Sequence, residues 1–257
     1  MMFPPEIFGE IFSFLTSEAS VLVACSQAHP IFAQLIEPTL YAHVMVHNHR
    51  ANDDKHHLSF KPNQLSALLS DNPRIVNYLR SLCVDVFQFG SDDEASKELI
   101  AILPGLKLER IRLTHSYGTN DWRSFPITFR TAFVACISTS SMKEIYLDNI
   151  SEFPLSSFAD CAGLKRLTLF RMAVPLLDSS FNFPQLEDLK LSDWTMGGPC
   201  QDLFSWLLTH ACRLRSLTLA TYRDDVMCAF LPRLVAICST SLVNLSIYYA
   251  KLSKSST

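Results

Sequence analysis

The sequence predicts an α/β fold in which short parallel strands stack into one sheet and are joined by outer helices or turns. Two stretches carry the same pattern: LKRLTL begins at Leu164, and LEDLKL begins at Leu186, 22 residues later. In each, the last three residues alternate apolar and polar side chains, so one side of a strand faces inward and the other faces water. Such a strand cannot bury its apolar side alone, but a stack of copies can. The pattern therefore favours a repeat architecture over a single globular core.

Units of this kind follow one another along the second and larger part of the chain. Their first apolar residues are Leu79, Leu108, Met142, Leu164, Leu186, Leu214 and Leu242. A spacing of about 20 to 29 residues with this order of leucines resembles the leucine-rich repeat family. The resemblance implies a curved solenoid with a parallel sheet on its concave face, since strands joined by crossovers run parallel. The asparagine that often follows the pattern in that family is replaced here, for example by Ile150 and Met172.

Helices are predicted in the longer connections between these strands. The two steps of 22 residues, after Met142 and after Leu164, leave room only for a turn or a short 3₁₀ segment. A capping box that begins at Ser91 opens one of the helices. The predicted helices cover residues 62–69, 91–103, 125–137, 201–212 and 224–238, the last interrupted near Pro232.

The first forty residues show a different pattern, that of three short helices. Residues 3–15 read FPPEIFGEIFSFL, and the two prolines suit a first helical turn, which needs no backbone donor. Ile7 and Ile11 begin one apolar row, and Phe8 and Phe12 form a second, so this helix must be covered on more than one side. Two further helices are predicted, over residues 18–27 and from Pro30 to just before Pro38.

This N-terminal stretch resembles an F-box over roughly residues 3–44. In that family a Leu-Pro-x-Glu-Ile opening is followed by Ile-Phe-x-x-Leu. The matching positions here are Phe3, Pro4, Glu6, Ile7, Ile11, Phe12 and Leu15. The resemblance implies that these residues contact a Skp-family adaptor protein, and through it a cullin, in a Skp/cullin/F-box ubiquitin ligase. An F-box followed by leucine-rich repeats is a familiar domain order in the F-box family, and it implies a substrate-receptor subunit whose repeats bind a protein target.

The predicted domain organisation follows from these two patterns. Residues 1–46 form the F-box-like helical domain, residues 47–63 a polar linker, and residues 64–257 the irregular repeats with about seven strands. A second interpretation stays open at this point. In it the chain is a leucine-rich-repeat interaction scaffold unrelated to ubiquitination, and the N-terminal helices only cap the solenoid.

Composition and charge narrow the classes of partner. The 257 residues carry 22 Lys and Arg against 25 Asp and Glu, a formal net charge of −3, so the basic field typical of nucleic-acid binding is missing. No apolar run approaches the ~18 residues of a membrane span. The eight cysteines are scattered without a C-x-x-C pair, and most sit in apolar patterns where a thiol packs as a small hydrophobe. We therefore expect a cytoplasmic or nuclear protein that binds neither nucleic acid nor a membrane.

The sequence contains no constellation that carries catalysis. Nucleophile-elbow, P-loop, paired-histidine zinc and Rossmann glycine patterns are missing, and the seven glycines form no phosphate-binding loop. His43, His47, His49, His56 and His57 gather in a polar stretch, but no cysteine or clear carboxylate partner completes a zinc ligand set. We therefore predict no enzyme activity, no catalytic residue, no cofactor and no bound metal.

The polar side of the strands is the predicted binding surface for the target. At the third position of successive units the charges alternate through Arg110, Glu144, Arg166 and Asp188, which indicates structural pairing between neighbouring strands. Aromatic side chains on this water-facing side are typical of binding hot spots. The residues predicted to bind the target on the concave face are Arg112, Tyr146, Phe170, Lys190 and Tyr248.

Overall fold

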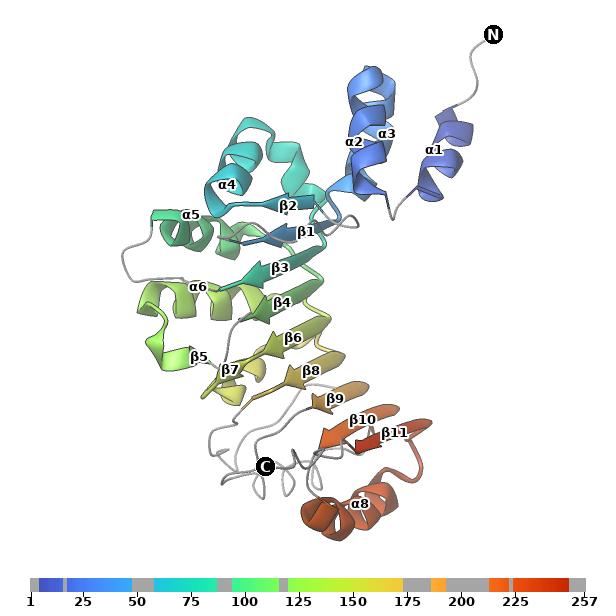
Figure 1. Cartoon of the computed structure of the whole chain (residues 1–257), viewed down its shortest axis with the longest axis vertical. Coiled ribbons are helices and arrows are strands. Elements are labelled where there is room, and N and C mark those ends of the chain that lie inside the picture. Colours follow the sequence, from blue (N-terminus) through green and yellow to red (C-terminus); the bar gives the residue numbers. More distant parts are fainter. Residues whose placement is uncertain are drawn as a thin grey trace, which may run out of the picture. The chain divides into compact units, whose positions relative to one another are not determined.

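The computed structural model of the chain describes residues 5–15, 18–47, 58–86, 94–115, 120–172, 186–192, 213–221 and 224–249. Over these residues the protein is a mixed α/β structure, and nine of its strands belong to one parallel sheet (Figure 1). The chain divides into two compact units. Unit 1 comprises Met1–Arg112 and Pro126–Cys136, and unit 2 comprises Leu113–Phe125 and Ile137–Thr257.

The strands of unit 1 form around β1 (His43–Val46), which lies between β2 (Leu58–Phe60) and β3 (Ser81–Asp85) in parallel pairings. The register places Val44 beside Leu82 and Val46 beside Val84, and all four side chains are buried. Along both strands these buried residues alternate with partly exposed ones, so one side of the strands is buried and the other is accessible. A further strand, β4 (Arg110–Thr114), begins in this unit.

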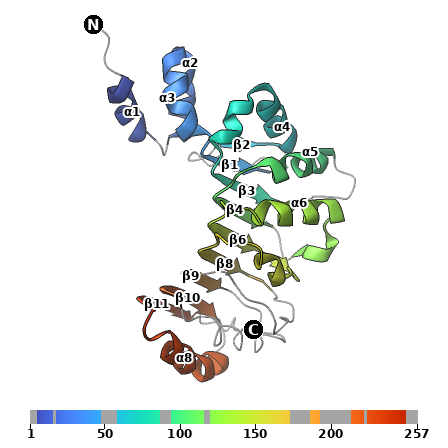
Figure 2. The ribbon, with the colours of Figure 1, turned by 180° about the vertical axis from the view of Figure 1, so that it is seen from behind.

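Three helices lie on one side of the strands of unit 1: α4 (Pro62–Asp71), α5 (Glu94–Ile102) and α6 (Ile127–Ile137) (Figures 1 and 2). Each contributes large apolar side chains to the interior. The buried residues include Leu65 and Leu69 of α4, Leu99 of α5, and Phe129 and Phe133 of α6. Helices on one side of a parallel sheet are the expected way to cover its apolar face.

Unit 2 contains five strands that neighbour one another in chain order. They are β6 (Glu144–Asp148), β8 (Arg166–Phe170), β9 (Asp188–Ser192), β10 (Ser216–Thr221) and β11 (Asn244–Tyr249). One row of the sheet runs through Ile145, Leu167, Leu189, Leu217 and Leu245. The first four are buried, whereas Leu245 is 39% exposed because β11 is the last strand of the sheet.

The same backbone contact recurs at the start of successive strands. The carbonyl oxygen of Lys143 accepts hydrogen bonds from the amides of Lys165 and Arg166, and that of Lys165 accepts bonds from Glu187 and Asp188. The carbonyls that accept an equivalent pair of bonds are those of Ala42, Arg80, Glu187 and Arg215. The repeat seen in the sequence is therefore also a repeat of backbone geometry.

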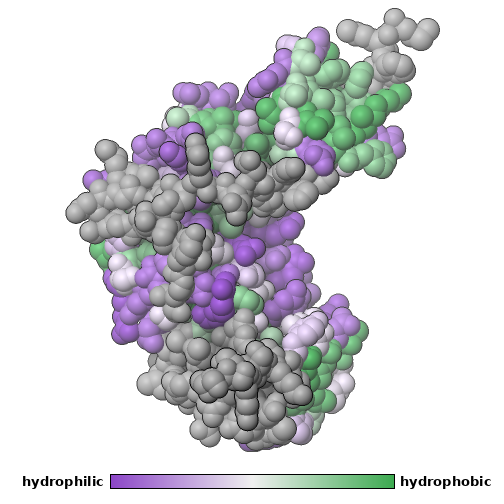
Figure 3. Space-filling view, viewed as in Figure 1, coloured by the Kyte–Doolittle hydropathy of each residue, from purple (hydrophilic) through white to green (hydrophobic). Residues whose placement is uncertain are grey.

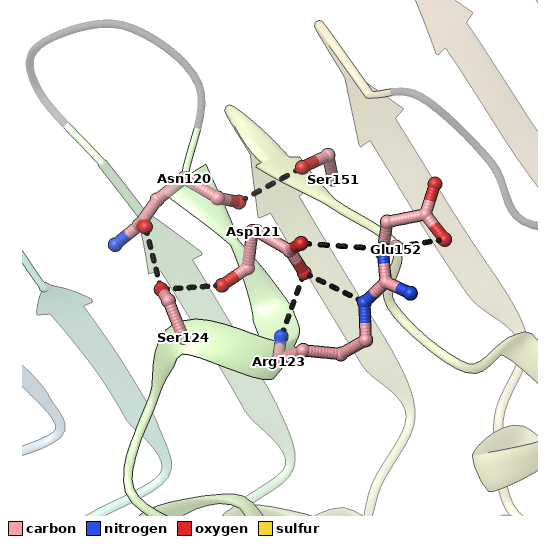
Figure 4. A network of polar contacts seen from close by, with 6 residues as sticks. All are labelled: Asn120, Asp121, Arg123, Ser124, Ser151 and Glu152. Carbon is pink, nitrogen blue, oxygen red and sulfur yellow. Dashed lines mark hydrogen bonds and ion pairs between the residues drawn. The ribbon is translucent and has the colours of Figure 1, made fainter.

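A second, two-stranded parallel sheet in unit 2 joins β5 (Asn120–Asp121) to β7 (Ile150–Ser151). The 3₁₀ turn η3 (Trp122–Ser124) follows β5, and the Trp122 ring packs edge-on against Phe153, with centroids 4.7 Å apart. The same segments also carry a polar network (Figure 4). Arg123 pairs with Asp121 at 3.2 Å and with Glu152 at 3.4 Å, while the hydroxyls of Ser124 and Ser151 donate to Asn120. We interpret this network as structural, since the Arg123 to Glu152 and Ser151 to Asn120 contacts join the segments of the two short strands.

The seven predicted strands are confirmed as β3, β4, β6, β8, β9, β10 and β11, and the 3₁₀ turn η4 (Leu155–Phe158) occupies the first of the short connections. The predictions about two prolines were wrong, because α3 (Pro30–Leu40) continues through Pro38 and α8 (Asp224–Cys238) through Pro232. In α3 the last turn is closed by the amide of Tyr41, which donates to the carbonyl of Glu37 at 3.0 Å. Pro38 falls too close to the helix end to stop it. The predicted helix at 201–212 and the capping box at Ser91 lie outside the described residues.

The predicted domain boundaries differ from the structure at two places. β2 lies inside the predicted linker, residues 47–63, and β1 lies at the end of the predicted helical domain, residues 1–46. Both strands belong to the main sheet. Strands of three and four residues give too short an alternation to be recognised in a sequence, and pairing with β3 is what stabilises them.

The described cysteines behave as apolar residues. Cys136, Cys161 and Cys238 are buried, and burial raises the pKa of the Cys136 and Cys161 thiols to about 12. Both are therefore neutral thiols at physiological pH, as the apolar patterns around them predict. Among the helices that the structure describes, none has the length and apolar character that a membrane span requires.

Candidate protein-interaction surfaces

The N-terminal helices α1 (Pro5–Ser13), α2 (Ala19–Ala28) and α3 share a small apolar core. Its buried members are Phe12, Leu22, Ile36 and Leu40. Phe32 of α3 joins the two aromatic residues of α1, with ring centroids 4.8 Å from Phe8 and 5.5 Å from Phe12. The row Phe8, Phe12 and Leu15 therefore faces inward, because spacings of four and three residues place side chains on one side of a helix.

The adjacent side of α1 is also apolar, and it is exposed. We call Ile7, Ile11 and Phe14 the outer row; their side chains are 42%, 49% and 79% exposed. Val21 of α2 and Ile31 of α3 are further exposed apolar residues of the same three-helix segment. In Figure 3 hydrophobic side chains gather over these helices. Large aliphatic and aromatic side chains grouped in this way are typical of protein-binding surfaces.

The structure separates the seven residues predicted to bind an adaptor into three groups. Glu6, Ile7 and Ile11 are exposed, while Phe12 and Leu15 belong to the core or pack against it. Phe3 and Pro4 lie outside the described residues. Phe14, the most exposed member of the outer row, was not predicted; it directly follows α1, and its spacing of three residues from Ile11 continues the row.

The three-helix segment is attached to the rest of unit 1 by an apolar and a polar contact. Leu58 of β2 packs against the helical core, and Glu37 of α3 pairs with Arg74 at 2.8 Å. Arg74 belongs to the turn η1 (Pro73–Asn77). Burial, with the charge of Glu37 as a smaller cause, raises the pKa of the nearby Tyr41 hydroxyl above its ordinary value. The helices therefore cover the β2 end of the sheet as well as presenting the outer row.

On the polar side of the unit 2 strands, the predicted charge pairing is present at one position. Glu144, Arg166 and Asp188 are neighbours in the register, and Arg166 Nε lies 3.1 Å from Glu144 Oε2. Oδ1 of Asp188 is buried and has no hydrogen-bond partner among the described residues. The alternation of charges is thus partly a structural feature, as predicted.

The five residues predicted to bind a target do not all lie in one unit. Arg112 is exposed on the part of β4 that belongs to unit 1. The other four lie in unit 2, where Lys190 and Tyr248 are exposed and Tyr146 and Phe170 are half-buried. Two rows of the register connect them: Tyr146, Thr168 and Lys190 form one, and Phe170, Ser192, Ala220 and Tyr248 form the other.

Arg171, which the sequence did not single out, controls the surroundings of Phe170. Its backbone has a φ of 49°, in the left-handed region that residues other than glycine rarely adopt. Its guanidinium lies 4.7 Å from the centroid of the Phe170 ring and donates two hydrogen bonds of 3.0 Å to the carboxylate of Asp148. Nearby Asn149, with φ of 60°, donates from its side-chain amide to the carbonyl of His115 at 2.9 Å. These contacts fix the ends of β6 and β8, and so the position of Phe170.

Arg171→Ala is expected to lower the free energy of unfolding by about 2–4 kcal/mol, because it removes a forked pair from a buried carboxylate. The Asp148 side chain is only 7% exposed, although that of Arg171 is 46% exposed. Lys165→Ala is the matched control, since Lys165 pairs with Glu187 at 2.9 Å but both side chains are largely exposed. The control is expected to change stability by less than about 1 kcal/mol. Equal losses for the two variants in urea titrations would show that burial of the pair does not matter.

The described histidines do not assemble a metal site. Over the part of the chain that the structure describes, no group of three or more His, Cys, Asp or Glu side chains could hold a metal ion. His49, His56 and His57 lie outside that part.

A scan against protein-family models and searches of curated proteins and of solved structures found no match to the chain.

Proposed function

We propose that this chain is a substrate-receptor subunit of a Skp/cullin/F-box ubiquitin ligase in the cytoplasm or nucleus. In this proposal the N-terminal helices bind a Skp-family adaptor, and through it a cullin. The repeats form a curved leucine-rich-repeat solenoid whose polar sheet face binds a protein target. The observation that supports it best is the outer row, which adds an exposed apolar surface to a helix whose other apolar row already builds a core.

Leaving the apolar outer row in water has a cost in free energy that a partner can remove. Burying the exposed surface of Ile7, Ile11 and Phe14 against a partner contributes about 1–2 kcal/mol for each side chain. A helix that lays such a row into an apolar groove is a common mode of protein recognition. These are also the positions, or neighbours of the positions, at which the sequence resembles an F-box.

The target surface is proposed on the polar side of the unit 2 strands. Tyr146, Phe170, Lys190 and Tyr248 offer aromatic and cationic side chains there, which are enriched at binding hot spots. Arg112 offers a further cation on β4. In this role the chain holds its target, and another subunit of the ligase performs the chemistry.

The test is retention of a purified Skp-family adaptor by the full chain and by two variants. Ile11→Asp is expected to weaken adaptor binding by at least about 100-fold, because docking would bury a charge without a partner. Ile127→Asp is the matched control: it changes the same residue type on another helix of unit 1, where Ile127 is also exposed. The control is expected to bind the adaptor normally, and both variants to keep the far-UV circular dichroism of the parent.

Two outcomes would contradict the proposal. One is failure of the parent chain to retain any Skp-family adaptor, and the other is equal binding by Ile11→Asp and Ile127→Asp. The first outcome would favour the alternative, an interaction scaffold whose N-terminal helices only cap the repeats. The contact of Leu58 with the helical core and the Glu37 to Arg74 pair support that alternative, since both attach the helices to unit 1.

A further inference from the structure

A row of charged side chains lies at the strand starts of unit 2, outside the polar sheet face. Lys143, Lys165, Glu187 and Arg215 immediately precede β6, β8, β9 and β10, and each is joined to the next by the recurring backbone bonds. The side chains of two of them also meet, since Lys165 Nζ lies 2.9 Å from Glu187 Oε1. Val243, which precedes β11, continues the row, because its backbone amide donates a hydrogen bond to the carbonyl of Arg215.

Cations outnumber carboxylates here once the adjoining residues are included, since five Lys and Arg residues lie beside Glu144, Glu187 and Asp188. We call Lys143, Lys165, Arg166, Arg213 and Arg215 the basic ridge; all five are exposed. Arg166 lies where the ridge meets the polar sheet face, and it pairs there with Glu144. The hydrogen bond and charge of Lys165 hold the pKa of the Glu187 carboxyl below its ordinary value, and the charges of Arg215 and Arg166 add to this effect against burial. Three cations of the ridge therefore act on one carboxylate. The ridge carries surplus positive charge on a chain whose net charge is −3.

The spacing of the ridge suits an extended polypeptide. Neighbouring strands lie about 4.8 Å apart, so Lys143 to Arg215 spans roughly 14 Å. In an extended chain, side chains on one side recur about every 6.6 Å, so two or three acidic residues of a partner can reach the ridge at once. Val243, 78% exposed at the end of the row, offers an aliphatic contact in addition.

These features favour a protein segment over other polyanions. A nucleic acid gains from aromatic side chains placed between the cations, whereas here the carboxylate of Glu187 lies between Lys165 and Arg215. A mixed row of cations and carboxylates with an apolar end is the complementarity expected at a protein interface. We propose that the basic ridge docks an acidic, extended segment of a protein partner. This surface is separate from the outer row, so the inference does not depend on adaptor binding.

The test measures fluorescence anisotropy of a labelled polyglutamate peptide about eight residues long, which covers the ridge when extended. The double variant Lys165→Glu with Arg215→Glu is expected to bind it at least about tenfold more weakly than the parent, and added salt is expected to weaken the parent's binding. Lys107→Glu with Arg233→Glu is the matched control, because it changes the net charge equally at exposed residues elsewhere. It is expected to stay within about twofold of the parent.

Three results would overturn the inference: no binding of polyglutamate by the parent, equal loss in the ridge and control variants, or equally tight binding of a single-stranded oligonucleotide or an anionic lipid vesicle. The last would assign the ridge to a different class of partner. Adaptor retention measured on the ridge variant separates this inference from the proposed function. We expect it to be unchanged, so either can fail alone.

Discussion

Phe12→Asp is expected to unfold the N-terminal helices, lowering the free energy of unfolding of this segment by about 4 kcal/mol or more. Phe12 is only 7% exposed and contacts Phe32 in the core shared by α1, α2 and α3. Removing a buried phenylalanine side chain costs about 3–5 kcal/mol, and the aspartate adds the cost of a charge in an apolar site. This core has four buried members, so few other contacts remain to stabilise the three helices once Phe12 is lost.

The neighbouring residue supplies the control for this experiment. Ile11→Asp places the same charge one position earlier on α1, where the side chain is 49% exposed. Hydrogen exchange is expected to show loss of amide protection in α1 to α3 for Phe12→Asp and near-native protection for Ile11→Asp. If both variants keep their protection, α1 does not pack through the Phe8 and Phe12 row. The comparison also shows why Ile11, and not Phe12, is the informative residue for adaptor binding.

Gly163→Ala is expected to destabilise unit 2 by about 2–3 kcal/mol, because the added methyl group has no space. A Cβ at this position would lie 2.6 Å from the carbonyl oxygen of Ser140 and 2.8 Å from that of Met142. Both are backbone atoms in the turn that precedes β6, and Gly163 itself precedes β8 by three residues. The glycine thus permits the close approach of two successive repeat units at their strand starts.

Gly105→Ala tests whether this effect is specific to the crowded position. A Cβ at Gly105 would meet nothing within 4 Å. This substitution is expected to be neutral or to stabilise by about 0.5 kcal/mol, through loss of unfolded-state entropy. Thermal unfolding monitored for both variants would contradict the packing argument if Gly163→Ala melted at the same temperature as Gly105→Ala.

The candidate surfaces could be predicted from the sequence only in part. Exposed cations and aromatics on the strands, such as Lys190 and Tyr248, follow from the alternation of polar and apolar residues along each strand. Arg171 could not be found in this way, because it follows β8 and its role depends on Asp148, 23 residues earlier in the chain. The basic ridge was missed for a similar reason. Its residues are single charges in separate turns, and only the register of the strands brings them into one row.

The sequence by itself determined the seven strands, their parallel direction and the type of most connections. These features depend on local periodicity and on the length of chain between strands, and both can be read without knowing which segments touch. Only the tertiary structure decided which apolar row of α1 faces inward, because Ile7 and Ile11 are as hydrophobic as Phe8 and Phe12. The inward row is the one that packs against Phe32, Leu22 and Ile36, which lie on other helices. The same holds for β1 and β2. Their few residues form strands because β3 pairs with β1, and β1 with β2, so that backbone groups bond to each other instead of to water.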